Sequence, residues 1–84
     1  MNKVSVRYFA SIREALGQGS EAVETSATTL GALRDELIAR GGAHASSLAR
    51  GRAVRMALNQ TLSDESATLA DGAEVAFFPP VTGG

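Results

Sequence analysis

Residues 74–84 read EVAFFPPVTGG, and this stretch decides where the predicted sheet ends. Residues 74–78 are typical of a strand, because Val and Phe favour extended, half-buried backbone. Pro79 and Pro80 have no N–H group to donate and cannot continue a sheet ladder. We therefore predict a folded domain over residues 1–78 and an extended C-terminal tail over residues 79–84, with a reach of about 20 Å.

Two glycines, Gly83 and Gly84, close this stretch. Glycine has no Cβ, so a Gly-Gly segment can pass through a narrow channel and adopt most backbone angles. A terminal carboxylate next to two glycines is also open to chemical attack from either face. The alternative is a frayed chain end of no function. The rigid Pro-Pro pair upstream favours a tail that delivers its carboxylate into another protein's active site.

Upstream, alternation predicts a first strand and helical periodicity predicts a main helix. In residues 3–9, Val4, Val6 and Tyr8 alternate with Lys3, Ser5, Arg7 and Phe9, which is the pattern of a half-buried strand. In residues 29–40, Leu30, Leu33, Leu37 and Ile38 form one apolar stripe. Thr28 or Thr29 is expected to cap this helix, and Gly41-Gly42 to end it.

The remaining segments have weaker patterns. We expect a helical turn at 11–16 with Ser11 as its cap, strands at 21–26, 54–58 and 61–62, and turns at 59–60 and 71–72. Residues 43–52 are small and polar, and are expected to form one irregular turn. The order strand, strand, helix, strand, short strand, strand predicts an α+β fold of the β-grasp (ubiquitin-like) type: a roll in which a mixed sheet carries one main helix across it. A ferredoxin-like split would need a second full helix.

Composition limits the classes of function. The chain has 84 residues, a net charge of -1, a pI near 5.7 and no cysteine. Disulfides and thiolate metal sites are thereby excluded, and the charge gives no reason to expect binding to nucleic acid or to a membrane. The N-terminus has no apolar signal segment, so we expect a cytoplasmic protein. Lys3 is the sole lysine, which argues against chains linked through lysine side chains.

Three segments together resemble the small subunit of molybdopterin synthase. They are residues 6–14 (VRYFASIRE), residues 57–62 (ALNQTL) and residues 69–84 (LADGAEVAFFPPVTGG). The resemblance covers nearly the whole chain and is weakest over residues 25–52. Its most specific part is the terminal octet, from Phe77 to Gly84.

This resemblance implies a sulfur carrier that is the non-catalytic half of a two-chain synthase. An activating enzyme related to ubiquitin E1 would use ATP to adenylate the Gly84 carboxylate, and a sulfurtransferase donor would supply the sulfur of a thiocarboxylate. The large synthase subunit would then pass this sulfur to cyclic pyranopterin monophosphate, in a heterotetramer of two small and two large subunits. The chain itself would bind no cofactor and no metal.

The resemblance also implies where partners bind. Phe9, Leu62 and Phe78 match an exposed apolar patch on the sheet, and Pro79, Pro80, Val81, Thr82 and Gly83 match the segment that enters the large subunit. Core packing is the competing interpretation for each of the three apolar residues. Phe77, which faces away from Phe78, is expected in the core.

Other features give weaker signals. His44 is expected to be a surface loop residue, and Asp35-Glu36 part of a solvated helix face. Arg50, Arg52 and Arg55 could meet an acidic patch on a partner, but they lack the interleaved aromatic residues of a nucleic-acid site. Two alternatives stay open: a sulfur carrier for thiamine or tRNA thiolation, and a ubiquitin-like modifier that is conjugated to lysines through Gly84.

Overall fold

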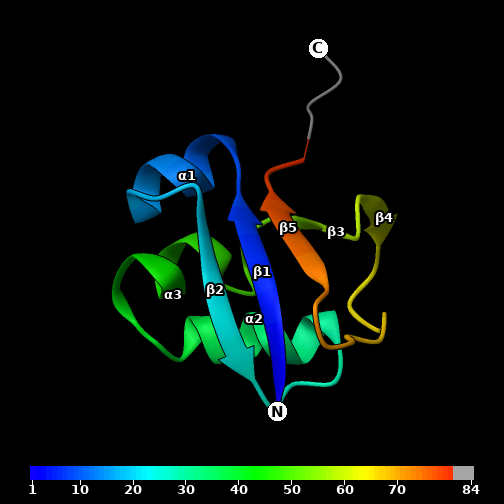
Figure 1. Cartoon of the computed structure of the whole chain (residues 1–84). Helices are drawn as coiled ribbons and strands as arrows, with labels where there is room; N and C mark the ends of the chain where they lie inside the picture. The colour runs from blue at the N-terminus through cyan, green and yellow to red at the C-terminus, as the bar shows by residue number, and fades with distance from the viewer. Residues whose placement is uncertain (81–84) are drawn as a thin grey trace.

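A five-stranded mixed sheet organises the molecule, in the strand order β2-β1-β5-β3-β4. The structure is a computed structural model that describes residues 1–80. Figure 1 shows α2 crossing one face of this sheet, with α1 and α3 extending the same helical side. The elements are β1 (Asn2–Tyr8), α1 (Ala10–Leu16), β2 (Ser20–Thr25), α2 (Leu30–Ile38), α3 (Gly42–Leu48), β3 (Arg55–Leu58), β4 (Thr61–Ser63) and β5 (Glu74–Phe78).

The first and last strands lie side by side at the centre of the sheet. β1 pairs with β5 in parallel, with Val6 opposite Val75 and Tyr8 opposite Phe77. The other pairs, β1 with β2, β3 with β5 and β3 with β4, are antiparallel. A parallel pair between the chain's first and last strands, with α2 packed across the sheet, is the β-grasp arrangement, and the predicted fold class is confirmed.

Alternation along the strands separates a buried face from an open one. The buried face contributes residues that are at most 1 % exposed, and these pack against three fully buried leucines of α2. The set comprises Val4, Val6, Tyr8, Val75, Phe77, Leu30, Leu33 and Leu37. Burying each such side chain stabilises the fold by about 1.5–3 kcal/mol. The predicted alternation of the first strand and the predicted place of Phe77 in the core are both confirmed.

The main helix begins and ends close to the predicted residues. Thr29 is its N-cap, and its side-chain oxygen accepts a hydrogen bond from the Ala32 N–H at 3.2 Å. Residues 59 and 60 form the predicted turn between β3 and β4, with φ of 51° and 69° at Asn59 and Gln60. Positive φ at both positions is what a tight two-residue hairpin requires.

Three local predictions were wrong. Residues 42–48 form a helix, α3, where one irregular turn was expected; its Leu48 is fully buried. The first short helix begins at Ala10 after Phe9 as N-cap, so Ser11 lies inside it and does not cap it. Val54 precedes β3, which begins at Arg55. Of these segments, α3 is held by a distant residue, because the Leu48 carbonyl accepts a hydrogen bond from Arg34, and a local pattern does not contain this contact.

None of the helices in residues 1–80 has both the length and the hydropathy needed to span a bilayer.

Candidate protein-interaction site

The C-terminal segment leaves the sheet where β5 ends at Phe78. In the last ladder positions Phe77 lies opposite Tyr8, and Phe78 lies opposite Arg55. Pro79 and Pro80 follow outside any strand and are half-buried. The prediction that the sheet ends at Phe78 is confirmed. The roles predicted for Val81, Thr82, Gly83 and Gly84 concern residues outside those that the structure describes.

An apolar patch lies on the open face of the sheet close to this exit. Because Phe77 is fully buried, its neighbours Ala76 and Phe78 face the open side. Leu62 pairs with Ala57, which pairs in turn with Ala76, so these three form a row across β4, β3 and β5. Neighbouring strands are about 4.8 Å apart, so the row is about 10 Å long.

Phe9 extends this patch at the end of β1. Its backbone N–H donates a hydrogen bond to the Phe77 carbonyl oxygen at 3.1 Å, which holds it beside the end of β5. Its side chain is on the surface, since Phe9 is 44 % exposed and Leu62 is 58 % exposed. Phe78 is half-buried, and so it is less exposed than Phe9 and Leu62. We call Phe9, Ala57, Leu62, Ala76 and Phe78 the apolar patch.

Charged side chains border the apolar patch. Arg7 on β1 and Glu74 on β5 approach to 4.0 Å, and both lie on the open face. Arg55, opposite Phe78, is exposed as well. An apolar centre with a charged rim is the usual anatomy of a protein–protein contact surface. The arrangement is suited to protein binding.

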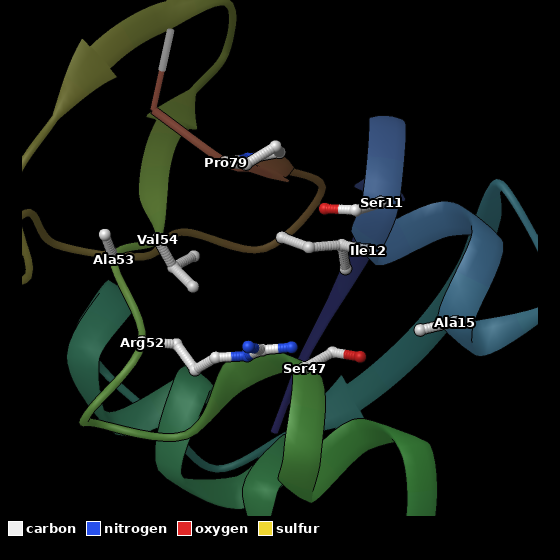
Figure 2. Close-up of a pocket in the computed structure, with 8 residues that line it drawn as sticks. All are labelled: Ser11, Ile12, Ala15, Ser47, Arg52, Ala53, Val54 and Pro79. Carbon is white, nitrogen blue, oxygen red and sulfur yellow. The ribbon is translucent and has the colours of Figure 1, made fainter. Parts of the chain in front are cut away.

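A hollow of about 210 Å³ lies on the helical side of the exit, and we call it the tail-base hollow. Figure 2 shows its walls: residues of α1, Ser47 of α3, the segment 52–54 and Pro79. Pro79 is the first residue after β5, so this hollow and the apolar patch flank the same point of exit.

A buried arginine, Arg34, holds the segment that forms one wall of the hollow. Arg34 is 4 % exposed and donates to the carbonyl oxygens of Leu48 at 2.7 Å, Ala49 at 2.8 Å and Arg52 at 3.2 Å. Its Nη1 also pairs with Glu65 at 3.2 Å. The last carbonyls of a helix lack intrahelical donors, and Arg34 supplies donors to the carbonyl of Leu48, the last residue of α3, and to that of its C-cap, Ala49. Sequence reasoning missed this role, because nothing local marks Arg34 as buried.

Arg50 belongs to the same internal network. It bonds Asp35 at 3.0 Å, the Gly31 carbonyl at 3.1 Å, and Glu65. The hydrogen bond that Arg50 donates to the Glu65 carboxylate raises the pKa of Arg50, and burial opposes this only in part. The expectation that Arg50, Arg52 and Arg55 form one partner-facing cluster was therefore wrong for Arg50. Asp35 is exposed as expected, but it serves as an internal partner of Arg50.

A second polar cluster joins α3 to the edge of the sheet around Glu21 on β2. The Glu21 carboxylate accepts from the Tyr8 hydroxyl at 2.7 Å and Arg40 at 2.7 Å, and lies 3.0 Å from His44 Nε2. Burial raises the pKa of Glu21, but the hydrogen bonds from His44, Tyr8 and Arg40 outweigh this and lower it to about 2. Burial and the neighbouring Glu21 raise the pKa of Tyr8.

His44 is therefore not the surface loop residue that was expected. It lies in α3, packs edge-on against the Tyr8 ring at 6.1 Å, and its side chain is 17 % exposed. The sequence gives no sign of its pairing with Glu21, because 23 residues separate the two. Within residues 1–80, no three His, Cys, Asp or Glu side chains gather closely enough to hold a metal ion.

Comparison with known proteins assigns the family. The model of the ThiS family matches residues 6–84. The chain belongs to the ThiS family. The molybdopterin synthase sulfur carrier subunit of Escherichia coli is 42 % identical over 81 residues, which are 96 % of this chain and 99 % of that protein. The protein of the same name from Mycobacterium tuberculosis is 41 % identical over 86 residues, with both chains fully covered. The resemblance to the molybdopterin synthase small subunit is thus confirmed.

Solved structures of similar proteins agree with the fold of this ThiS family member. A putative molybdopterin converting factor subunit 1 from Pyrococcus furiosus superimposes with a TM-score of 0.79 at 28 % identity, over 96 % of this chain and all of that one. Subunit 1 in a complex with subunit 2 of the molybdopterin-converting factor from Helicobacter pylori gives 0.68 at 29 % identity, over 98 % and 99 %. SAMP1 from Haloferax volcanii gives 0.77 at 25 % identity, over 99 % and 100 %.

Proposed function

We propose that this ThiS family protein is the sulfur carrier subunit of a molybdopterin synthase, with Gly84 as its reacting group. The observation that carries the proposal is the identity of 42 % to a molybdopterin synthase sulfur carrier subunit over nearly the full length of both chains. The geometry supports it, because Pro79 and Pro80 begin a C-terminal segment directly beside the apolar patch. A partner that binds the patch is then well placed to receive the segment.

The proposed chemistry begins with activation of the terminal carboxylate. At neutral pH this carboxylate is anionic, with an ordinary pKa of about 3.5, and it resists nucleophiles. An E1-like enzyme joins it to the AMP portion of ATP and releases pyrophosphate. A sulfur nucleophile supplied by a sulfurtransferase then displaces AMP and leaves a thiocarboxylate on Gly84.

The large synthase subunit is the proposed acceptor of the tail. The thiocarboxylate sulfur bonds to a carbon of cyclic pyranopterin monophosphate inside that subunit and displaces an oxygen substituent, which leaves with a proton. Water then hydrolyses the resulting thioester, so that the sulfur stays on the pterin and Gly84 returns to the carboxylate. Docking through the apolar patch holds the sulfur near its target and makes the attack effectively intramolecular. This chain supplies the reacting group, and the large subunit supplies the acids and bases. We propose the heterotetramer of two small and two large subunits as the working assembly.

Reconstitution with the large subunit and pyranopterin precursor tests this function. Loss of Gly84, or one residue added after it, is expected to abolish product formation, because the reacting carbon is removed or displaced. Circular dichroism of both variants should match that of the wild-type protein, since β5 ends six residues earlier. Product formation by the extended chain would contradict the tail mechanism.

A protein-modifier function is the second candidate. It is favoured by the similarity to SAMP1 from Haloferax volcanii, because a related solved structure from that organism is described as small archaeal modifier protein 1. Both functions begin with the same adenylation. Gly-Gly remnants on lysines of other cellular proteins, found by mass spectrometry after proteolysis, would favour the modifier. A carrier for thiamine or tRNA thiolation has less support, since the relatives named above are molybdopterin synthase subunits.

A further inference from the structure

The Arg52 guanidinium and the hydroxyls of Ser11 and Ser47 line the tail-base hollow, and both Nη atoms and both hydroxyls form no side-chain hydrogen bond among residues 1–80. Arg52 donates through Nε to the Ser46 carbonyl at 3.1 Å, and none of the carboxylates in residues 1–80 forms an ion pair with it. Figure 2 shows the Arg52 guanidinium directed toward Ser47, with the Ser11 hydroxyl facing the hollow from α1. Both Nη atoms of Arg52 are therefore free to donate hydrogen bonds to a group on another molecule.

Arg52 is held in place for such a contact. Its carbonyl oxygen accepts from the buried Arg34 at 3.2 Å, and its own Nε is fixed by Ser46. Arg50, two residues earlier, differs: its three guanidinium nitrogens donate to Asp35, Glu65 and the Gly31 carbonyl. Of these two neighbouring arginines, only Arg52 keeps donors for an external group. A guanidinium fixed in advance loses less conformational entropy when it binds.

The walls of the hollow select the chemistry of the occupant. Ile12, Val54 and Pro79 provide apolar surface, and no acidic residue lines the hollow. Its volume of about 210 Å³ is below the roughly 300–1,000 Å³ of pockets that hold small molecules. One side chain with an apolar stem and a carboxylate head fits this size, these walls and this charge.

The position of the hollow indicates where the carboxylate comes from. Pro79 forms part of its wall and is the first residue of the tail. Because Pro79 joins the tail to β5, a protein that takes up the tail comes close to this hollow. The hollow thus lies next to the proposed interface.

We propose that the tail-base hollow binds the side chain of an Asp or Glu from the protein that takes up the tail. This inference rests on the proposed function, because it requires the tail to enter a partner. Arginine binds carboxylates through two parallel N–H···O bonds, and the hydroxyls of Ser11 and Ser47 supply further donors. Because the hollow is fixed relative to Pro79, the contact sets the direction in which the tail leaves the domain.

Calorimetric titration of the full-length protein with the purified large synthase subunit of the same organism tests the proposal. Arg52→Met is expected to weaken binding about tenfold, and Arg52→Glu about fiftyfold, because like charges then face each other. Arg52→Lys should keep part of the affinity through its charge alone. Lys3→Glu is the matched control, because it makes the same change in net charge as Arg52→Glu. Lys3 lies at the start of β1, at the end of that strand away from the hollow, so this variant should bind within about twofold of wild type.

Ala53 provides a second pair of variants that leaves Arg52 untouched. Ala53 is exposed on the wall of the hollow, so longer side chains fit there without disturbing the core. Ala53→Glu places a carboxylate beside Arg52 that competes with the partner's, and is expected to weaken binding about fivefold. Ala53→Lys has similar size without an acceptor and should bind within about twofold of wild type.

The outcomes separate this proposal from the proposed function. Normal wild-type binding, with Arg52→Glu and Ala53→Glu within twofold of it and melting temperatures unchanged, overturns the carboxylate site alone. A wild-type protein that binds no large subunit and accepts no sulfur overturns the proposed function, and this inference with it. Loss of binding in Arg52→Glu and Ala53→Glu, with Lys3→Glu and Ala53→Lys intact, supports the site.

Discussion

Replacing Arg34 with Met is expected to destabilise the fold through α3 and the segment that follows it. Met matches much of the buried volume, so the cost comes from lost hydrogen bonds and not from a cavity. The Leu48 carbonyl is buried and loses its donor, which costs about 1–3 kcal/mol. The Ala49 and Arg52 carbonyls are partly accessible to water and add about 0.5–1 kcal/mol each.

The sum is about 3 kcal/mol, which in a domain of this size lowers the melting temperature by more than about 10 °C. Urea unfolding followed by circular dichroism measures the change in the free energy of unfolding. Arg50→Met is the matched control, because Arg50 also pairs with Glu65 but its side chain is 43 % exposed. Its cost should stay within about 1 kcal/mol. If Arg34→Met cost no more than Arg50→Met, Arg34 would not be what holds α3.

Three further changes test the apolar patch, the Glu21 cluster and the close contact between Gly31 of α2 and Glu65. Phe78→Asp should weaken large-subunit binding more than tenfold by calorimetry while lowering stability by only about 1 kcal/mol, and a larger stability loss would place Phe78 in the core. Because the pKa of Glu21 is lowered to about 2, its stabilisation of about 1–2 kcal/mol is present above pH 4.5 and is lost as pH falls toward 2. Glu21→Gln should flatten this acid limb of the stability–pH curve, and an unchanged limb would contradict the assignment. Gly31→Ala should lower the free energy of unfolding in urea by about 1 kcal/mol. The added Cβ would lie 2.9 Å from a side-chain oxygen of Glu65 and 3.3 Å from its carbonyl oxygen. A stabilised variant would show that the loop containing Glu65 moves to make room for the methyl group.

Elements with a strong local pattern could be predicted from the sequence. The two prolines end β5 wherever the fold places it, and the leucine stripe of α2 needs only one apolar surface to pack on. The turn at Asn59 and Gln60 is reinforced by the Asn59 side chain, which accepts from the Glu74 N–H at 2.9 Å. The two prolines, the leucine stripe and the Asn59-Gln60 pair are each local in the sequence, so a single chain reveals them. The contact between Asn59 and Glu74 spans 15 residues, and the sequence alone does not show it.

The parts that could not be predicted depend on distant partners. α3 has glycine, serine and alanine in place of an apolar stripe, and it is held by Arg34 at its end and by the His44–Glu21 contact at its start. Arg50 and Arg52 are the same residue type two positions apart, yet Asp35 and Glu65 form ion pairs only with Arg50. The tail-base hollow forms where α1, α3 and Pro79 meet, and no segment of the sequence contains it.

The central claim is that Gly84 carries sulfur. Its most direct test is the intact mass of the protein after incubation with ATP, an E1-like activating enzyme and a sulfur source. We expect one oxygen to be replaced by sulfur, and fragmentation to place the change at Gly84. An unchanged mass, with an enzyme shown to be active on another carrier, would contradict the account.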